Sequence, residues 1–121
     1  MTKKAQRHIK FFVEDILESI ERAEFILQQT TESDFMHDWQ KQDIVIRRLS
    51  IIGEAAKHIP AEIRHKFPQI AFKQMAALRD VVVHDYFGLH YQIIWNIVTI
   101  ELPPSKSYLR ELITYLETKE K

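Results

Sequence analysis

Apolar residues recur at helical spacing along nearly the whole chain. Between Ile9 and Leu27 they return every three or four residues, and acidic side chains occupy the opposite face. This segment predicts one long amphipathic helix. Residues 30–34 interrupt the pattern with threonine, glutamate, serine and aspartate, most of which compete for backbone groups and favour caps and turns. We expect the first helix to end before them.

The same spacing predicts further helices up to the C-terminus. Two glycines and four prolines provide little turn chemistry for a β fold, so the chain is expected to be all-α. The expected architecture is a bundle of about five to six helices. The later segments are Asp38 to about His58, a short helix that Pro60 starts and Pro68 stops, Phe72 to His84 or Tyr86, Tyr91 to Ile100, and a last helix capped by Ser105 or Ser107.

Composition and charge limit the class of protein. The 121 residues, 45% of them hydrophobic, suffice for one compact core, and we expect one domain over residues 1–121. The 17 basic and 17 acidic side chains balance, so no global positive field attracts nucleic acid. Any contact with RNA therefore has to be a local patch.

The chain has no cysteine, which excludes disulfides, thiolate zinc sites and cysteine nucleophiles. This composition suits a reducing cytoplasm, where we expect the protein to be. No apolar run approaches the roughly 20 residues that a membrane helix needs. The basic start is followed by acidic residues in an amphipathic pattern, which does not resemble a signal peptide. We expect no membrane contact and no cofactor.

The most informative segment places an arginine, a histidine and a tyrosine at the end of an apolar helical pattern. Four residues separate Arg79 from His84, and one residue separates His84 from Tyr86. This spacing resembles the R-x4-H-x-Y signature of the HepT-like proteins. These are a HEPN family of small bacterial and archaeal helical proteins linked to toxin–antitoxin pairs. Residues 51–56, Ile-Ile-Gly-Glu-Ala-Ala, and residues 89–95, Leu-His-Tyr-Gln-Ile-Ile-Trp, resemble the same family. From the three segments at their spacing, the resemblance extends over most of the chain.

The resemblance implies both an assembly and an activity. It implies a homodimer with a metal-independent endoribonuclease site composed of Arg79 and His84 at the dimer interface. Tyr86 matches the tyrosine that a partner nucleotidyltransferase antitoxin modifies with AMP. The chain holds no nucleotidyltransferase motif, so that partner has to be a separate polypeptide. The implied function is the toxin component of a HEPN/nucleotidyltransferase (HepT/MntA-like) toxin–antitoxin system.

Helix geometry sets a condition on such a site. Arg79 and His84 lie roughly 140° apart around an ideal helix, so one straight helix does not aim both at one atom. Either the helix loosens before His84, or two copies of the segment meet across a two-fold axis. Asp80 shares a face with His84 and is a candidate to orient its imidazole. Glu54 is a candidate to orient Arg79, and Gly53 beside it most simply permits close helix packing.

The residue types fit RNA cleavage without a metal. This reaction needs a base for the 2′-hydroxyl, an acid for the leaving 5′-oxygen and a cation for the charged phosphorus centre. His84 suits the first two roles, because the unperturbed histidine pKa of about 6.5 keeps both forms available near neutrality. Arg79 suits the third, because its planar, charged fork matches phosphate oxygens. In a dimer, one His84 is expected to act as base and the other as acid.

Other roles stay open for these residues. Arg79 is also a candidate structural ion-pair partner of Asp80, Asp85 or Glu54. Tyr86 is also a candidate interface aromatic, since tyrosine suits places where one end is buried and the other wet. The alternative function is a non-catalytic HEPN binding module that docks a nucleotidyltransferase and holds nucleotide or RNA. Balanced charge favours this alternative, and the intact Arg-His-Tyr set favours the enzyme.

The histidines do not predict a metal centre. His84 and His90 lack the i, i+4 spacing of paired helical ligands, and no fourth ligand is evident. His37, His58 and His65 stand in polar surroundings and are expected to face solvent. We expect no metal site.

Overall fold

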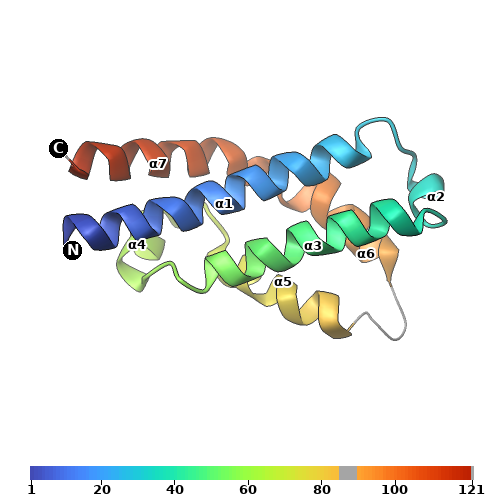
Figure 1. The fold of residues 1–121 in the computed structure, drawn as a ribbon, viewed down its shortest axis with the longest axis horizontal. Coiled ribbons are helices and arrows are strands. Elements are labelled where there is room, and N and C mark those ends of the chain that lie inside the picture. The colour runs from blue at the N-terminus through green and yellow to red at the C-terminus, as the bar shows by residue number, and fades with distance from the viewer. Residues whose placement is uncertain (85–89, 121) are drawn as a thin grey trace.

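The N-terminal helix α1 (Lys3–Leu27) is the element against which the other long helices pack. In the computed structural model, α3 (Trp39–Ala56) lies along one side of α1, and α7 (Lys106–Glu120) lies along another (Figure 1). The apolar stripe of α1 is buried between them, as its periodicity predicts.

The structure describes residues 1–84 and 90–120, and within this part the side chains of His84, Lys119 and Glu120 are not described. Every regular element in the described part is helical, which confirms the all-α fold. None of the described helices is long and apolar enough to cross a membrane.

Polar side chains start two helices where the sequence pattern is interrupted. The Asp38 carboxylate accepts a hydrogen bond from the Lys41 amide at 3.1 Å and caps α3. The Thr31 hydroxyl accepts one from the Asp34 amide at 3.0 Å. Thr31 thereby starts α2 (Glu32–Phe35), a single helical turn that the periodicity did not predict.

Long-range packing explains this extra turn. Phe35 is fully buried, and its ring centroid lies 5.8 Å from that of Trp95 and 6.1 Å from that of Tyr91, both in α6 (Tyr91–Asn96). The Gln42 side-chain amide donates to the Phe35 carbonyl at 2.8 Å. Burial of one aromatic ring and satisfaction of its backbone oxygen therefore hold α2 in place.

Helix α4 (Ala61–Lys66) carries the chain from α3 to α5 (Phe72–His84). The proline before α4 occupies its N-cap position, which fits the predicted start of a short helix. Arg64 of α4 donates to the carbonyl oxygens of Ala56 at 2.7 Å and Ile59 at 2.9 Å. These bonds satisfy a carbonyl at the C-terminal end of α3 and one in the turn that follows it, and α5 then packs along α3 (Figure 1).

The predicted helix from Tyr91 to Ile100 changes geometry before it ends. After α6 the chain forms a π-helical turn (Ile97–Glu101), in which the Leu102 amide donates to the Ile97 carbonyl at 2.9 Å. Ile97 and Leu102 are both buried, so the wider turn keeps both apolar side chains in the core.

A 3-10 turn (Pro103–Ser105) leads directly into α7. Ser107 therefore lies inside α7, and the prediction that it caps this helix is wrong. The two prolines do not separate the helices by a loop, because their fixed φ also suits the tight turn that joins them.

The buried faces of the later helices are the ones that apolar spacing predicts. In α7, Leu109, Leu112 and Leu116 recur at helical spacing and are fully buried, whereas Ile113 beside them is only half-buried. The apolar residues that recur at helical spacing in α3 and the turn after it are also buried: Val45, Leu49, Ile52, Ala56 and Ile59.

Candidate active site

A glycine sets how closely α3 and α5 approach each other. A Cβ atom added at Gly53 would lie 2.9 Å from the Arg79 amide nitrogen and 3.1 Å from the Arg79 Cβ. It would also lie 3.4 Å from the carbonyl oxygen of Met75, one turn earlier in α5. The missing side chain therefore lets α3 contact the backbone of α5 at Arg79, which confirms the packing role predicted for this glycine.

Replacing this glycine is expected to destabilise the protein. In an exposed helix, glycine to alanine gains about 1 kcal/mol from helix propensity. The methyl group of Gly53→Ala meets backbone at 2.9 Å, and overpacking typically costs ~1–3 kcal/mol. We expect the free energy of unfolding to fall by about 1 kcal/mol in urea titrations. Arg47→Ala, at an exposed position of α3, is the control and should change it by less than about 0.5 kcal/mol. Higher stability of Gly53→Ala would contradict the close contact.

Glu54, the next residue in α3, pairs with Arg79. The Arg79 Nη1 donates to the Glu54 Oε2 at 2.6 Å, and both side chains are 52% exposed. Pairs this exposed add only about 0–1 kcal/mol to stability, so the stronger consequence of the contact is orientation. It engages one guanidinium nitrogen and leaves the rest of the fork for a second anion.

Helix α5 stays regular through His84. The backbone therefore does not loosen before His84, and positions 79 and 84 point to sides of the helix roughly 140° apart. Arg79 lies on an outward stripe with Val83, which is 56% exposed, whereas Leu78 and Val82 are buried. The regular backbone of α5 thus puts positions 79 and 84 of one chain on different sides of the helix.

The other predicted site residues are described only in part. Asp80 is exposed, on the face of α5 that carries position 84. Asp85 and Tyr86 lie outside the described residues, as does the side chain of His84, so the contact predicted between Asp80 and His84 stays a prediction. Within residues 1–84 and 90–120, no group of three or more His, Asp and Glu side chains is placed to hold a metal ion.

The polar surroundings of His58 in the sequence predicted only that it faces solvent. The structure shows two further contacts of this residue. Its ring stacks on Phe12 of α1, with ring centroids 4.3 Å apart and planes 7° from parallel. The His58 Nε2 also lies 3.8 Å from the Glu54 Oε1. Glu54 therefore has Arg79 at one carboxylate oxygen and His58 at the other.

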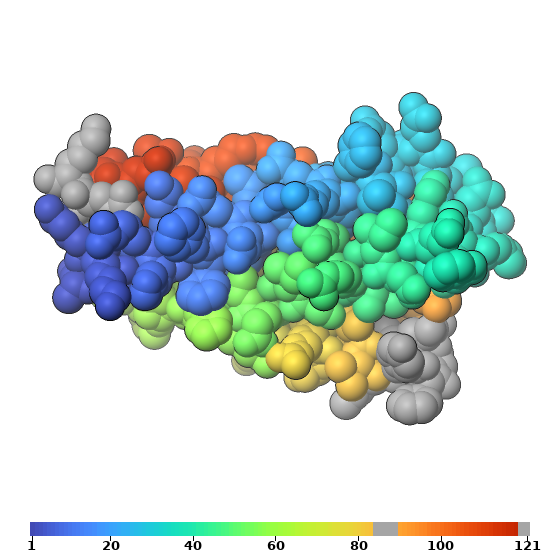
Figure 2. Space-filling view, in the orientation of Figure 1, coloured from blue at the N-terminus to red at the C-terminus, as the bar shows by residue number. Residues whose placement is uncertain are grey.

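The four side chains make consecutive contacts that connect α1, the C-terminal end of α3 and α5. Phe12 comes from α1, Glu54 from α3, His58 from the turn that follows α3, and Arg79 from α5. Figure 2 shows these three helices side by side on one face of the molecule. The i, i+4 spacing of Glu54 and His58 is visible in the sequence, but nothing in the sequence indicates that Phe12 joins them.

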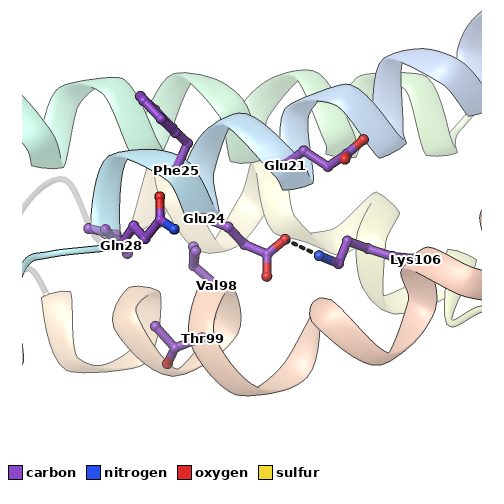
Figure 3. Close-up of a pocket in the computed structure, with 8 residues that line it drawn as sticks. Glu21, Glu24, Phe25, Gln28, Val98, Thr99 and Lys106 are labelled. Atoms are coloured by element: carbon purple, nitrogen blue, oxygen red, sulfur yellow. Dashed lines mark ion pairs between the residues drawn. The ribbon is translucent and has the colours of Figure 1, made fainter.

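A separate pocket of about 500 Å³ lies between α1 and the segment from the π-helical turn to the start of α7 (Figure 3). The Lys106 ammonium is the cation among its lining residues, and it pairs with Glu24 at 2.7 Å. Because the lining holds two carboxylates, Glu21 and Glu24, against this one ammonium, the pocket is poorly suited to a phosphate. Its lining does not include Arg79, which remains the candidate centre.

Fold and site together define a class of protein: a helical bundle in which an arginine, held by a glutamate of the neighbouring helix, precedes a histidine and a tyrosine. The family model described as Ribonuclease HepT-like matches residues 16–112. The chain belongs to this family.

Relatives in the family match nearly the full length of the chain. A protein of Thermococcus cleftensis named "Probable ribonuclease HepT" is 37% identical over 107 residues, which are 88% of this chain and 97% of that protein. A protein of Methanocaldococcus jannaschii named "Putative RNase MJ0127" is 36% identical over 115 residues, 95% of each chain. No solved structure matches the chain.

Proposed function

We propose that this protein is the toxin of a toxin–antitoxin pair and a metal-independent endoribonuclease with a composite site. The family and the names of its relatives support cleavage of RNA. The observation that carries the composite site is the regular helix α5, which places positions 79 and 84 roughly 140° apart around its axis. Two copies related by a two-fold axis bring both residue types to one cleft.

The proposed reaction is an internal transfer at phosphorus. One His84 imidazole removes the proton of a ribose 2′-hydroxyl, and the 2′-oxygen attacks the adjacent phosphorus. The bond from phosphorus to the 5′-oxygen breaks, and the imidazolium of the second His84 gives that oxygen a proton. The products are a 2′,3′-cyclic phosphate and a 5′-hydroxyl. Arg79 stabilises the charge that develops on the phosphate oxygens.

Two carboxylates support this chemistry. Glu54 holds Arg79 through Nη1. The guanidinium is therefore already oriented, and its remaining N–H groups can bind a phosphate. Asp80 lies one helical turn before His84 and would fix the orientation of its imidazole. Both are positioning residues, because neither touches RNA in this scheme.

The composite site is tested by diluting the enzyme. We expect RNA cleavage per protomer to be constant at high protein concentration, to fall as the dimer dissociates, and to persist in excess chelator with 2′,3′-cyclic phosphate ends. Val83→Glu places a charge on the exposed stripe beside Arg79 and should shift this loss of activity to higher protein concentration.

Ile100→Glu is the matched control, because Ile100 is also an exposed apolar helical residue, at 65%, but lies outside α5. It should leave the dilution profile unchanged. Specific activity that does not change with dilution, together with a monomeric mass in solution, would rule out the composite site. Binding of RNA without any cleavage would favour the non-catalytic module, which the balanced charge also favours.

The proposed regulation acts on Tyr86. A nucleotidyltransferase antitoxin, supplied by a second gene, would transfer AMP from ATP to the tyrosine hydroxyl and release pyrophosphate. In the sequence Tyr86 follows His84 by two residues, so the added phosphate and nucleoside would compete with RNA for Arg79. This would silence the nuclease without unfolding it.

A further inference from the structure

We propose that the stacked pair of Phe12 and His58 is a subsite for one unpaired RNA base, next to the phosphate bound by Arg79. The inference rests on the proposed ribonuclease function and names the part of the substrate that these residues would hold. It assigns a role to the one histidine in the described residues whose ring is stacked on another aromatic ring.

The pair presents a rigid aromatic surface. The ring of Phe12 is half-buried against the core and lies parallel to His58 at 4.3 Å. The His58 side chain nevertheless remains 49% exposed. Because Phe12 covers one face of the imidazole, this exposed area has to belong mainly to the opposite face and the edges. A ring that is backed on one side and open on the other can stack a planar ligand with little loss of side-chain freedom.

The spacing to Arg79 fits one nucleotide. A single carboxylate, that of Glu54, separates the two groups: its Oε1 lies 3.8 Å from the His58 Nε2, and its Oε2 lies 2.6 Å from the Arg79 Nη1. In RNA, the base and the phosphate of one nucleotide are likewise joined through a single ribose. An RNA phosphate at Arg79 would therefore place a neighbouring base within reach of the imidazole.

The balanced charge of the protein favours such a contact. Many RNA-binding proteins gain affinity from a positive surface, but here 17 basic and 17 acidic residues cancel. Glu54 in addition neutralises the arginine of the site. Stacking of unpaired bases on aromatic rings, histidine included, supplies affinity that does not depend on net charge.

The experiment measures binding of a labelled, single-stranded oligonucleotide whose 2′-hydroxyls are methylated, so that it cannot be cleaved. His58→Ala is expected to raise the dissociation constant on the order of tenfold, because the stacking ring is lost. His58→Phe keeps a ring and should stay within about twofold of the wild type. His37→Ala, which removes an exposed histidine of the α2 turn, is the matched control and should bind like the wild type.

Oligonucleotides with one abasic residue, moved position by position, identify the base that stacks. At one position the abasic change should weaken binding to the wild type and to His58→Phe, and should have no further effect on His58→Ala. Equal affinity of wild type and His58→Ala would overturn the subsite. Loss of affinity in His58→Phe as large as in His58→Ala would also overturn it, because the charge of the imidazole and not its stacking would then matter.

These outcomes separate the subsite from the proposed catalysis. Thermal unfolding of His58→Ala shows whether the variant is folded, and His58→Phe provides a second, ring-bearing variant. If the wild type binds as described but never cuts unmodified RNA, the nuclease proposal fails and the subsite stands. If Arg79→Ala stops cleavage while no change at His58 alters binding, the subsite fails and the nuclease stands.

Discussion

Alanine at Arg79 or at His84 is expected to lower the rate of RNA cleavage by about 10²–10³-fold or more, with the fold intact. Loss of one preorganised donor to the transition state costs about this much, and loss of a general acid or base costs a similar factor. Arg79→Lys should recover only part of the rate, since lysine keeps the charge but lacks the planar fork. Gel assays of a defined RNA under single-turnover conditions measure the rates.

The fold should tolerate these changes. Arg79 is half exposed, and its ion pair with Glu54 is also exposed, so urea unfolding should differ little from the wild type. Glu54→Gln separates the orientation of Arg79 from the charge of its partner. The amide oxygen can still accept the hydrogen bond from Arg79, but the negative charge of the carboxylate is lost. Cleavage by His84→Ala at the wild-type rate, or a wild-type reaction that stops in chelator, would reject the proposed mechanism.

Modification of Tyr86 is expected to suppress cleavage almost completely. Incubation with the cognate nucleotidyltransferase and ATP should add one or more AMP units, and each unit introduces an anion that can occupy the phosphate site at Arg79. Intact-mass spectrometry measures the chemical step, and the RNA assay measures its effect. Tyr86→Phe should escape both, since phenylalanine retains the ring and lacks the nucleophilic hydroxyl.

Tyr108→Phe is the control for this prediction. Tyr108 is a half-buried tyrosine in α7, and its replacement should leave both the mass increase and the suppression unchanged. The regulatory role of Tyr86 has to be abandoned if Tyr86→Phe gains the same mass as the wild type. It also has to be abandoned if the modified wild type cuts RNA at the original rate, whatever becomes of the nuclease proposal.

Much of the fold could be predicted because helices depend on local periodicity. The stripe of α1, the aspartate that starts α3 and the span of α5 follow from the spacing of apolar and capping residues. The single turn α2 and the π-helical turn could not be predicted in this way. Each exists because distant side chains bury an apolar residue, Phe35 in one case and Leu102 in the other.

The same division holds for the site. By itself the sequence determined the order of Arg79, His84 and Tyr86, the angle between the first two on a helix, and the candidacy of Glu54 as partner of Arg79. Only the tertiary structure decided that α5 stays regular and that a missing side chain at position 53 brings Glu54 to 2.6 Å from Arg79.

The tertiary structure alone also decided the surroundings of His58. Its neighbour Glu54 lies only four residues earlier in the chain, near the end of α3, whereas Phe12 comes from a distant helix and reaches His58 only when α1 packs on α3. Local spacing fixes which residues share a helix face, because the backbone repeats every few residues. Contacts between helices depend instead on how whole buried faces pack against each other, and no short segment of the chain contains that information.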